Sequence, residues 1–127
     1  MQHSRSISWF TFIGALAAAV HYAVAVGLEG STALAPGWAN VSGFLMAFPV
    51  SYVGHRTLSF AGHNAPHQQA LPRFLVVACG GFFANQVLLL SLLRWLGQPF
   101  WLTLGVVMVM VAFTSYILSR YWAFKSA

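Results

Sequence analysis

The chain has 127 residues, of which 59% are apolar and only 6% are charged. Soluble domains carry about 25% charged residues, so this composition excludes a soluble globular protein and predicts a single membrane domain over residues 1–127. Glu29 is the only carboxylate among the side chains, which excludes paired acid–base catalysis and a carboxylate metal cage within one chain. We therefore expect no enzyme, no catalytic residue, no cofactor and no metal site. The basic residues form no cluster, which argues against nucleic acid as a partner.

Four apolar stretches each have about the 20 residues that a membrane helix needs. In chain order they cover residues 7–28, 33–53, 74–93 and 100–118. The first two stretches are joined by a short hairpin, and so are the last two, whereas the middle connection is longer and polar. Its tail, residues 62–72, is expected to be an exposed loop. The predicted fold class is therefore an all-α integral membrane protein with four transmembrane helices.

The basic residues are distributed unequally between the two ends of these stretches. One end carries Arg5, Arg56, Arg73, Arg120 and Lys125, whereas the other carries only Arg94 and Glu29. Basic residues accumulate on the cytoplasmic side of membrane proteins. We therefore expect a multi-pass protein with the middle loop and both termini in the cytoplasm.

The two halves of the sequence resemble each other when one is shifted by 64 positions. The pattern Ser51-Tyr52-x3-Arg56-x3-Phe60 then coincides with Ser115-Tyr116-x3-Arg120-x3-Phe124, and His21 falls on Asn85. The halves, residues 9–61 and 73–125, are each a helical hairpin. Because each contains two spans, they are predicted to be parallel repeats.

Arg56 and Arg120 end the second and fourth spans at the predicted cytoplasmic interface. Each follows a tyrosine, Tyr52 or Tyr116, by four positions, which places both side chains on one helix face. A guanidinium at this depth can bind a phosphate with two hydrogen bonds. The alternative interpretation is that these residues only anchor the helix ends at the membrane surface.

Polar side chains also occur within the spans. His21 and Asn85 lie about two-thirds of the way along the first and third spans, Gln86 follows Asn85, and Asn40 with Ser42 lies in the second span. Polar groups at membrane depth indicate a functional site, although hydrogen bonding between helices is the common structural alternative. Pro49 is expected to kink the second span.

Both halves resemble the GtrA-like family of small bacterial membrane proteins over nearly the whole chain. In this family each half begins with Arg-Phe and carries a polar residue in the middle of the following helix, and Arg73-Phe74 through Asn85 is similar to that beginning. The ending of each half is similar to residues 115–124, Ser-Tyr-Ile-Leu-Ser-Arg-Tyr-Trp-Ala-Phe. The first half departs from the pattern at three positions. The family usually has Asn or Asp at the position of His21, Asn at that of His55 and Trp at that of Leu58.

This resemblance implies translocation, or flipping, of a polyprenyl-phosphate-linked monosaccharide across the bacterial inner membrane for cell-surface polysaccharide biosynthesis. A separate membrane glycosyltransferase would then use the sugar. Within that role, Arg56, Arg120, Tyr52 and Tyr116 would bind the phosphate headgroup. The sugar path would be formed by His21, Asn85, Gln86 and Asn40.

Two other functions remain open at this point. The chain could be a scaffold or accessory subunit of a glycosyltransferase, or an exporter similar to small multidrug resistance proteins. The exporters rely on a glutamate buried in the first helix, whereas Glu29 lies at a helix end. Because four helices enclose little space, we also expect a homo-oligomer, with the stripe of Gly43, Ala47 and Ser51 as a candidate interface.

Overall fold

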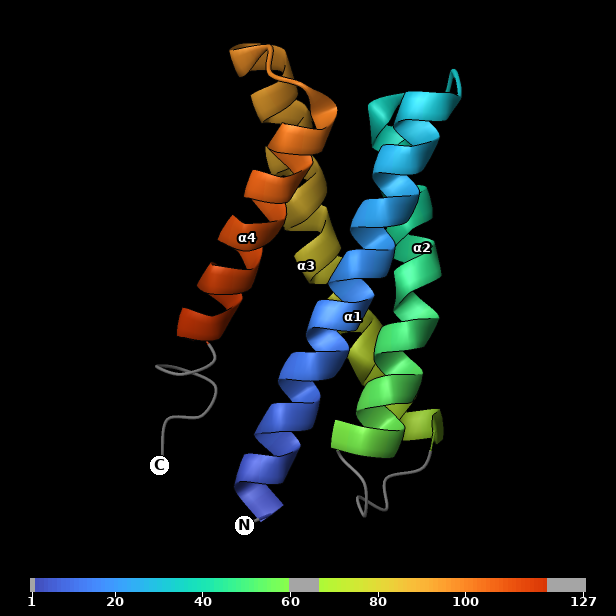
Figure 1. Ribbon diagram of the computed structural model, residues 1–127. Helices are drawn as coiled ribbons and strands as arrows, with labels where there is room; N and C mark the ends of the chain where they lie inside the picture. Colours follow the sequence, from blue (N-terminus) through green and yellow to red (C-terminus); the bar gives the residue numbers. More distant parts are fainter. Residues whose placement is uncertain (1, 60–66, 119–127) are drawn as a thin grey trace.

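The structure is a computed structural model that describes residues 2–59 and 67–118 (Figure 1). All regular elements in this part of the chain are helices and none is a strand, which confirms the all-α prediction. The helices are α1 (Gln2–Ser31), α2 (Pro36–Gly54), a short π helix η1 (His55–Ser59), α3 (His67–Leu96) and α4 (Phe100–Leu118).

Short connections join α1 to α2 and α3 to α4 at one end of the bundle, which we call the hairpin end. At the first connection the Thr32 hydroxyl donates to the Leu28 carbonyl at 2.5 Å, and Pro36 begins α2 in the position where a helix tolerates proline best. At the second, Gly97 has a φ of 63°, a left-handed conformation that ends α3 and that glycine adopts without strain.

The opposite end, which we call the terminal end, holds the start of α1 and the end of α4 (Figure 1). The start of α3 also lies at this end. It begins at His67, so the last part of the connection that the sequence predicts to be a loop is helical. Gln68, Gln69 and Ala70 favour helix, and Pro72 is accommodated inside it.

Two of the described helices contain segments long and apolar enough to cross a membrane, Thr11–Ser31 and Leu75–Leu96. In α4 the apolar segment Phe100–Thr114 is shorter. Asn40 and Pro49 lie inside α2, which has 19 residues, and reduce its apolar character. These findings support a membrane protein, whereas four spans, the repeat and the orientation stay predictions.

Helices α1 and α2 form one hairpin, and α3 and α4 form a second (Figure 1). A core in the half of the bundle near the hairpin end joins the two hairpins. Its buried residues come from all four helices: Ala25 of α1, Ala39 of α2, Leu89 of α3, and Phe100, Leu104 and Val107 of α4. The hairpins are thus held together mainly in that half.

The small residues of α2 allow α1 to approach closely. Gly43 and Ala47 are buried, and a Cβ atom added to Gly43 would lie 2.5 Å from the His21 carbonyl oxygen. At Gly54 an added Cβ would lie 2.6 Å from Cγ2 of Ile13. Two residues of the stripe expected to form an interface between copies, Gly43 and Ala47, are therefore buried within the chain itself, whereas Ser51 is half-buried. The interface between copies stays a prediction. The homo-oligomer likewise stays a prediction.

Candidate functional site

Four polar side chains from three helices meet inside the bundle. Nε2 of His21 donates to Oδ1 of Asn40 at 2.7 Å, because an amide oxygen can only accept. The Asn40 Nδ2 donates to Oδ1 of Asn85 at 2.7 Å and to Oε1 of Gln86 at 2.8 Å. Gln86 in turn donates from Nε2 to the Gly37 carbonyl at 3.1 Å. We call His21, Asn40, Asn85 and Gln86 the polar network.

The polar network contains all four residues that the sequence predicts for a sugar path. Asn40 lies at its centre and is fully buried, and His21 and Asn85 are also buried. Among the described residues, no buried side-chain nitrogen or oxygen lacks a hydrogen-bond partner. The predicted interhelical hydrogen bonding is therefore present. A ligand must exchange hydrogen bonds with this network, since leaving a buried polar group unpaired costs about 1–3 kcal/mol.

Ser42, the other polar residue noted in the second span, does not join the polar network. Its hydroxyl donates to the Trp38 carbonyl of the same helix at 3.0 Å. The reason is geometric, because a serine inside a helix readily bonds the carbonyl four residues earlier.

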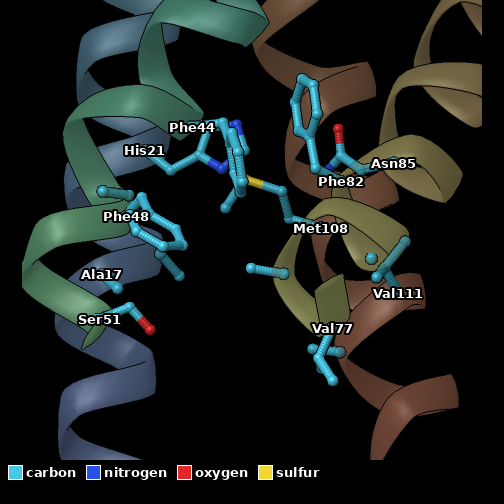
Figure 2. Close-up of a pocket in the computed structure, with 15 residues that line it drawn as sticks. Ala17, His21, Phe44, Phe48, Ser51, Val77, Phe82, Asn85, Met108 and Val111 are labelled. Atoms are coloured by element: carbon cyan, nitrogen blue, oxygen red, sulfur yellow. The ribbon is translucent and has the colours of Figure 1, made fainter. Parts of the chain in front are cut away.

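A groove of about 260 Å³ lies between the two hairpins, and we call it the terminal groove (Figure 2). His21 and Asn85 contribute polar atoms from the network to its lining, and most of the remaining lining is apolar. The lining residues are Ala17, Ala18 and His21 of α1; Phe44, Ala47, Phe48 and Ser51 of α2; Val77, Ala78, Gly81, Phe82 and Asn85 of α3; and Met108, Val111 and Ala112 of α4. An apolar groove with few polar groups is the usual form of a small-molecule site.

Aromatic rings follow the terminal groove away from the network. Phe44 and Phe82, from opposite hairpins, stack with ring centroids 4.5 Å apart and an interplanar angle of 17°. Further along α2, Phe48 and Tyr52 stack with centroids 6.4 Å apart. Arg56 follows Tyr52 by one turn, in η1. Phe44, Phe48 and Tyr52 thus form a row of rings along α2 from the polar network toward the predicted phosphate site, and the first two line the terminal groove.

A second groove, of about 400 Å³, lies between α2 and α3 nearer the hairpin end. Its lining residues are Ala35, Pro36, Gly37, Trp38, Val41, Gln86 and Leu90. We call it the hairpin-end groove. Gln86 brings the polar network into this second groove, as Asn85 does into the first.

Of the predicted phosphate ligands, the structure describes Tyr52 and Arg56, both partly buried at the terminal end. Arg120 lies outside the described residues, and the side chain of Tyr116 is not among those described. The predicted pairing of two arginines thus stays a prediction. Next to Arg56, burial lowers the pKa of His55 below its ordinary value of 6.5.

Sequence reasoning missed two features of the site. One is the ring stack of Phe44 and Phe82. The sequence indicates it only in that each ring lies about one helical turn from a residue of the polar network, Asn40 or Asn85. The other is a bond between the hairpins, in which the Tyr22 hydroxyl donates to the Trp101 carbonyl at 2.8 Å. Nothing local in the sequence indicates the second, because its partner is a backbone group.

The family model described as GtrA/DPMS, transmembrane domain, matches residues 9–124. No curated protein and no solved structure matches the chain significantly.

Proposed function

The chain belongs to the GtrA/DPMS transmembrane-domain family, which is linked to translocation of lipid-linked sugars, and we propose that it moves a polyprenyl-phosphate-linked monosaccharide across the cytoplasmic membrane. The sugar would serve glycosylation of cell-surface polysaccharide by a separate membrane glycosyltransferase. The family is associated with transport rather than with catalysis, and translocation breaks no covalent bond.

The terminal groove carries this proposal. Its walls are apolar and its polar side chains include His21 and Asn85, so a lipid-linked sugar can direct its hydroxyl groups toward hydrogen-bonding partners. A monosaccharide needs such partners within hydrocarbon, because its polar groups would otherwise be buried unpaired. The polyprenyl tail needs none and can stay in the surrounding lipid.

Arg56 is the proposed partner of the phosphate, with Arg120 as its counterpart and Tyr52 and Tyr116 beside them. Asn40 and Arg56 are sixteen residues apart, which in a helix corresponds to roughly 24 Å. The sugar and the phosphate are bonded directly to each other, so they cannot occupy the two places at the same time. The arginine is thus a first position for the headgroup, and the polar network is a later one.

The test is transport by the purified protein in liposomes with a labelled polyprenyl-phosphate-linked sugar. We expect Arg56→Ala to slow translocation about tenfold, the effect of losing one charge-assisted hydrogen bond. Arg94→Ala is the matched control, because Arg94 lies at the opposite end of the bundle. Asn85→Leu should also slow translocation, and Ser42→Ala should not.

Wild-type protein that moves no more lipid-linked sugar than empty liposomes would contradict the proposal. The scaffold function would then be favoured, with the chain needed only for the activity of a glycosyltransferase. Normal translocation by both Arg56→Ala and Asn85→Leu would refute the assigned path.

A further inference from the structure

Asn85 and Gln86 are neighbours on α3 but line different grooves. Asn85 lines the terminal groove, and Gln86 lines the hairpin-end groove. Consecutive helix residues point about 100° apart, which explains how adjacent side chains reach different spaces. Both amide oxygens accept from the same donor, Nδ2 of Asn40.

The two grooves lie on opposite sides of this donor along the bundle. The α2 residues that line the hairpin-end groove end at Val41, and those that line the terminal groove begin at Phe44, further along the helix. Asn40, Ala39 and Leu89 are fully buried at this level. In the described structure, these buried residues therefore lie at the boundary between the grooves.

We propose that Asn40 is the gate between two sites for the same hydroxyl-bearing headgroup, one in each groove. This inference rests on the proposed function. It adds a second binding site, in the hairpin-end groove, where Gln86 binds the sugar after Asn85 has released it.

Hydrogen-bond exchange explains how such a gate opens for a sugar. A hydroxyl group in the terminal groove can donate to the Asn85 oxygen in place of Asn40, and its own oxygen can accept a bond from the Asn40 amide. The same exchange at the Gln86 oxygen then admits the hydroxyl to the hairpin-end groove. No buried amide is left unpaired in either step, whereas an apolar molecule would leave at least one unpaired. The gate thus selects for hydroxyl-bearing ligands.

Cysteine labelling tests the gate without measuring transport. Cys79 is the only cysteine and is exposed, so it is first replaced in Cys79→Ser. Ser51→Cys then places one thiol in the terminal groove, and a membrane-impermeant maleimide is added from either side of membrane vesicles. We expect this thiol to react from one side only while Asn40 is present.

Removing the gate should allow reaction from both sides. With Asn40→Ala, we expect labelling of the Ser51→Cys thiol from the second side to rise about tenfold. Gln86→Leu provides a second variant should Asn40→Ala not fold, and it should raise the same labelling to a smaller extent. Ser42→Ala is the matched control, because Ser42 lies two residues from Asn40 and bonds only within its own helix.

Labelling that stays restricted to one side in both Asn40→Ala and Gln86→Leu would overturn the gate. Equal labelling from both sides in the protein with Asn40 intact would overturn it as well. A chain that shows the expected labelling but moves no lipid-linked sugar would contradict the proposed function and leave the gate in place.

Discussion

Gly43→Ala tests whether close contact between α1 and α2 holds the polar network together. The added Cβ would lie 2.5 Å from the His21 carbonyl oxygen, 2.7 Å from Cδ2 of the same residue and 3.1 Å from Cβ of Ala25. The nearest of these atoms is backbone, so no side-chain rotation can remove the clash. The two helices must move apart instead.

The size of this movement follows from the contact distances. Ordinary contact begins at 3.4 Å, so the helices must separate by about 0.9 Å at this level. The bond between His21 and Asn40 is 2.7 Å long, and the same movement directed along it would lengthen it to about 3.6 Å, beyond the range of a hydrogen bond. Overpacking of this kind costs about 1–3 kcal/mol, and the weakened bond adds to it.

Gly27→Ala is the matched control for this substitution. Gly27 lies in α1, and an added Cβ there would meet no atom within 4 Å. Both substitutions gain the same helix propensity, which favours alanine by roughly 0.5–1 kcal/mol, so this gain cancels between them. We expect Gly43→Ala to be about 1–3 kcal/mol less stable than Gly27→Ala, measured by reversible unfolding in detergent micelles with tryptophan fluorescence. Equal stability of the two variants would refute this account of the helix contact.

The remaining predictions concern contacts between the hairpins and the terminal end. Tyr22→Phe removes the bond to the Trp101 carbonyl and should cost about 1 kcal/mol of unfolding free energy; an unchanged value would show that the bond contributes nothing. Leu104→Ala should cost about 2 kcal/mol or more because Leu104 is fully buried, whereas exposed Leu102→Ala should change stability little; equal effects would contradict the core assignment. Lowering the pH through 6.5 should reduce stability, since the depressed pKa of His55 means that the unfolded chain binds this proton first. His55→Gln should remove that part of the pH dependence in the same unfolding assay. If the unfolding free energy of this variant still falls equally with pH, another group causes the dependence.

The asymmetry between the two halves bears directly on the gate. Under the predicted repeat, the position of Asn40 in the first half corresponds to Leu104 in the second. Leu104 is fully buried in the apolar core, and Asn40 is fully buried in the polar network. The chain thus places one amide where an exact repeat would place two, which fits a single gate beside the packed core of the hairpin end.

Composition and apolar patterning by themselves determined the helical class, the approximate bounds of the helices and the residue types of the site. Scarce charge and long apolar runs leave helices as the structure that satisfies the backbone in lipid. His21, Asn40, Asn85 and Gln86 stand out in the sequence because polar groups are costly at that depth. The helical start of α3 was not predicted. Residues 67–72 were expected to belong to a polar loop, but the helix propensity of Gln68, Gln69 and Ala70 extends α3 into this segment.

Only the tertiary structure decided which of these side chains meet. Helical periodicity gives the direction of a side chain around its own helix but not the rotation of one helix against another. The close approach at Gly43 brings α1 onto α2, and this contact places His21 beside Asn40. Packing of α3 against α2 then allows one amide nitrogen to serve both Asn85 and Gln86. Gly43, which the sequence indicates only as one member of a small-residue stripe, is the contact that makes this arrangement possible.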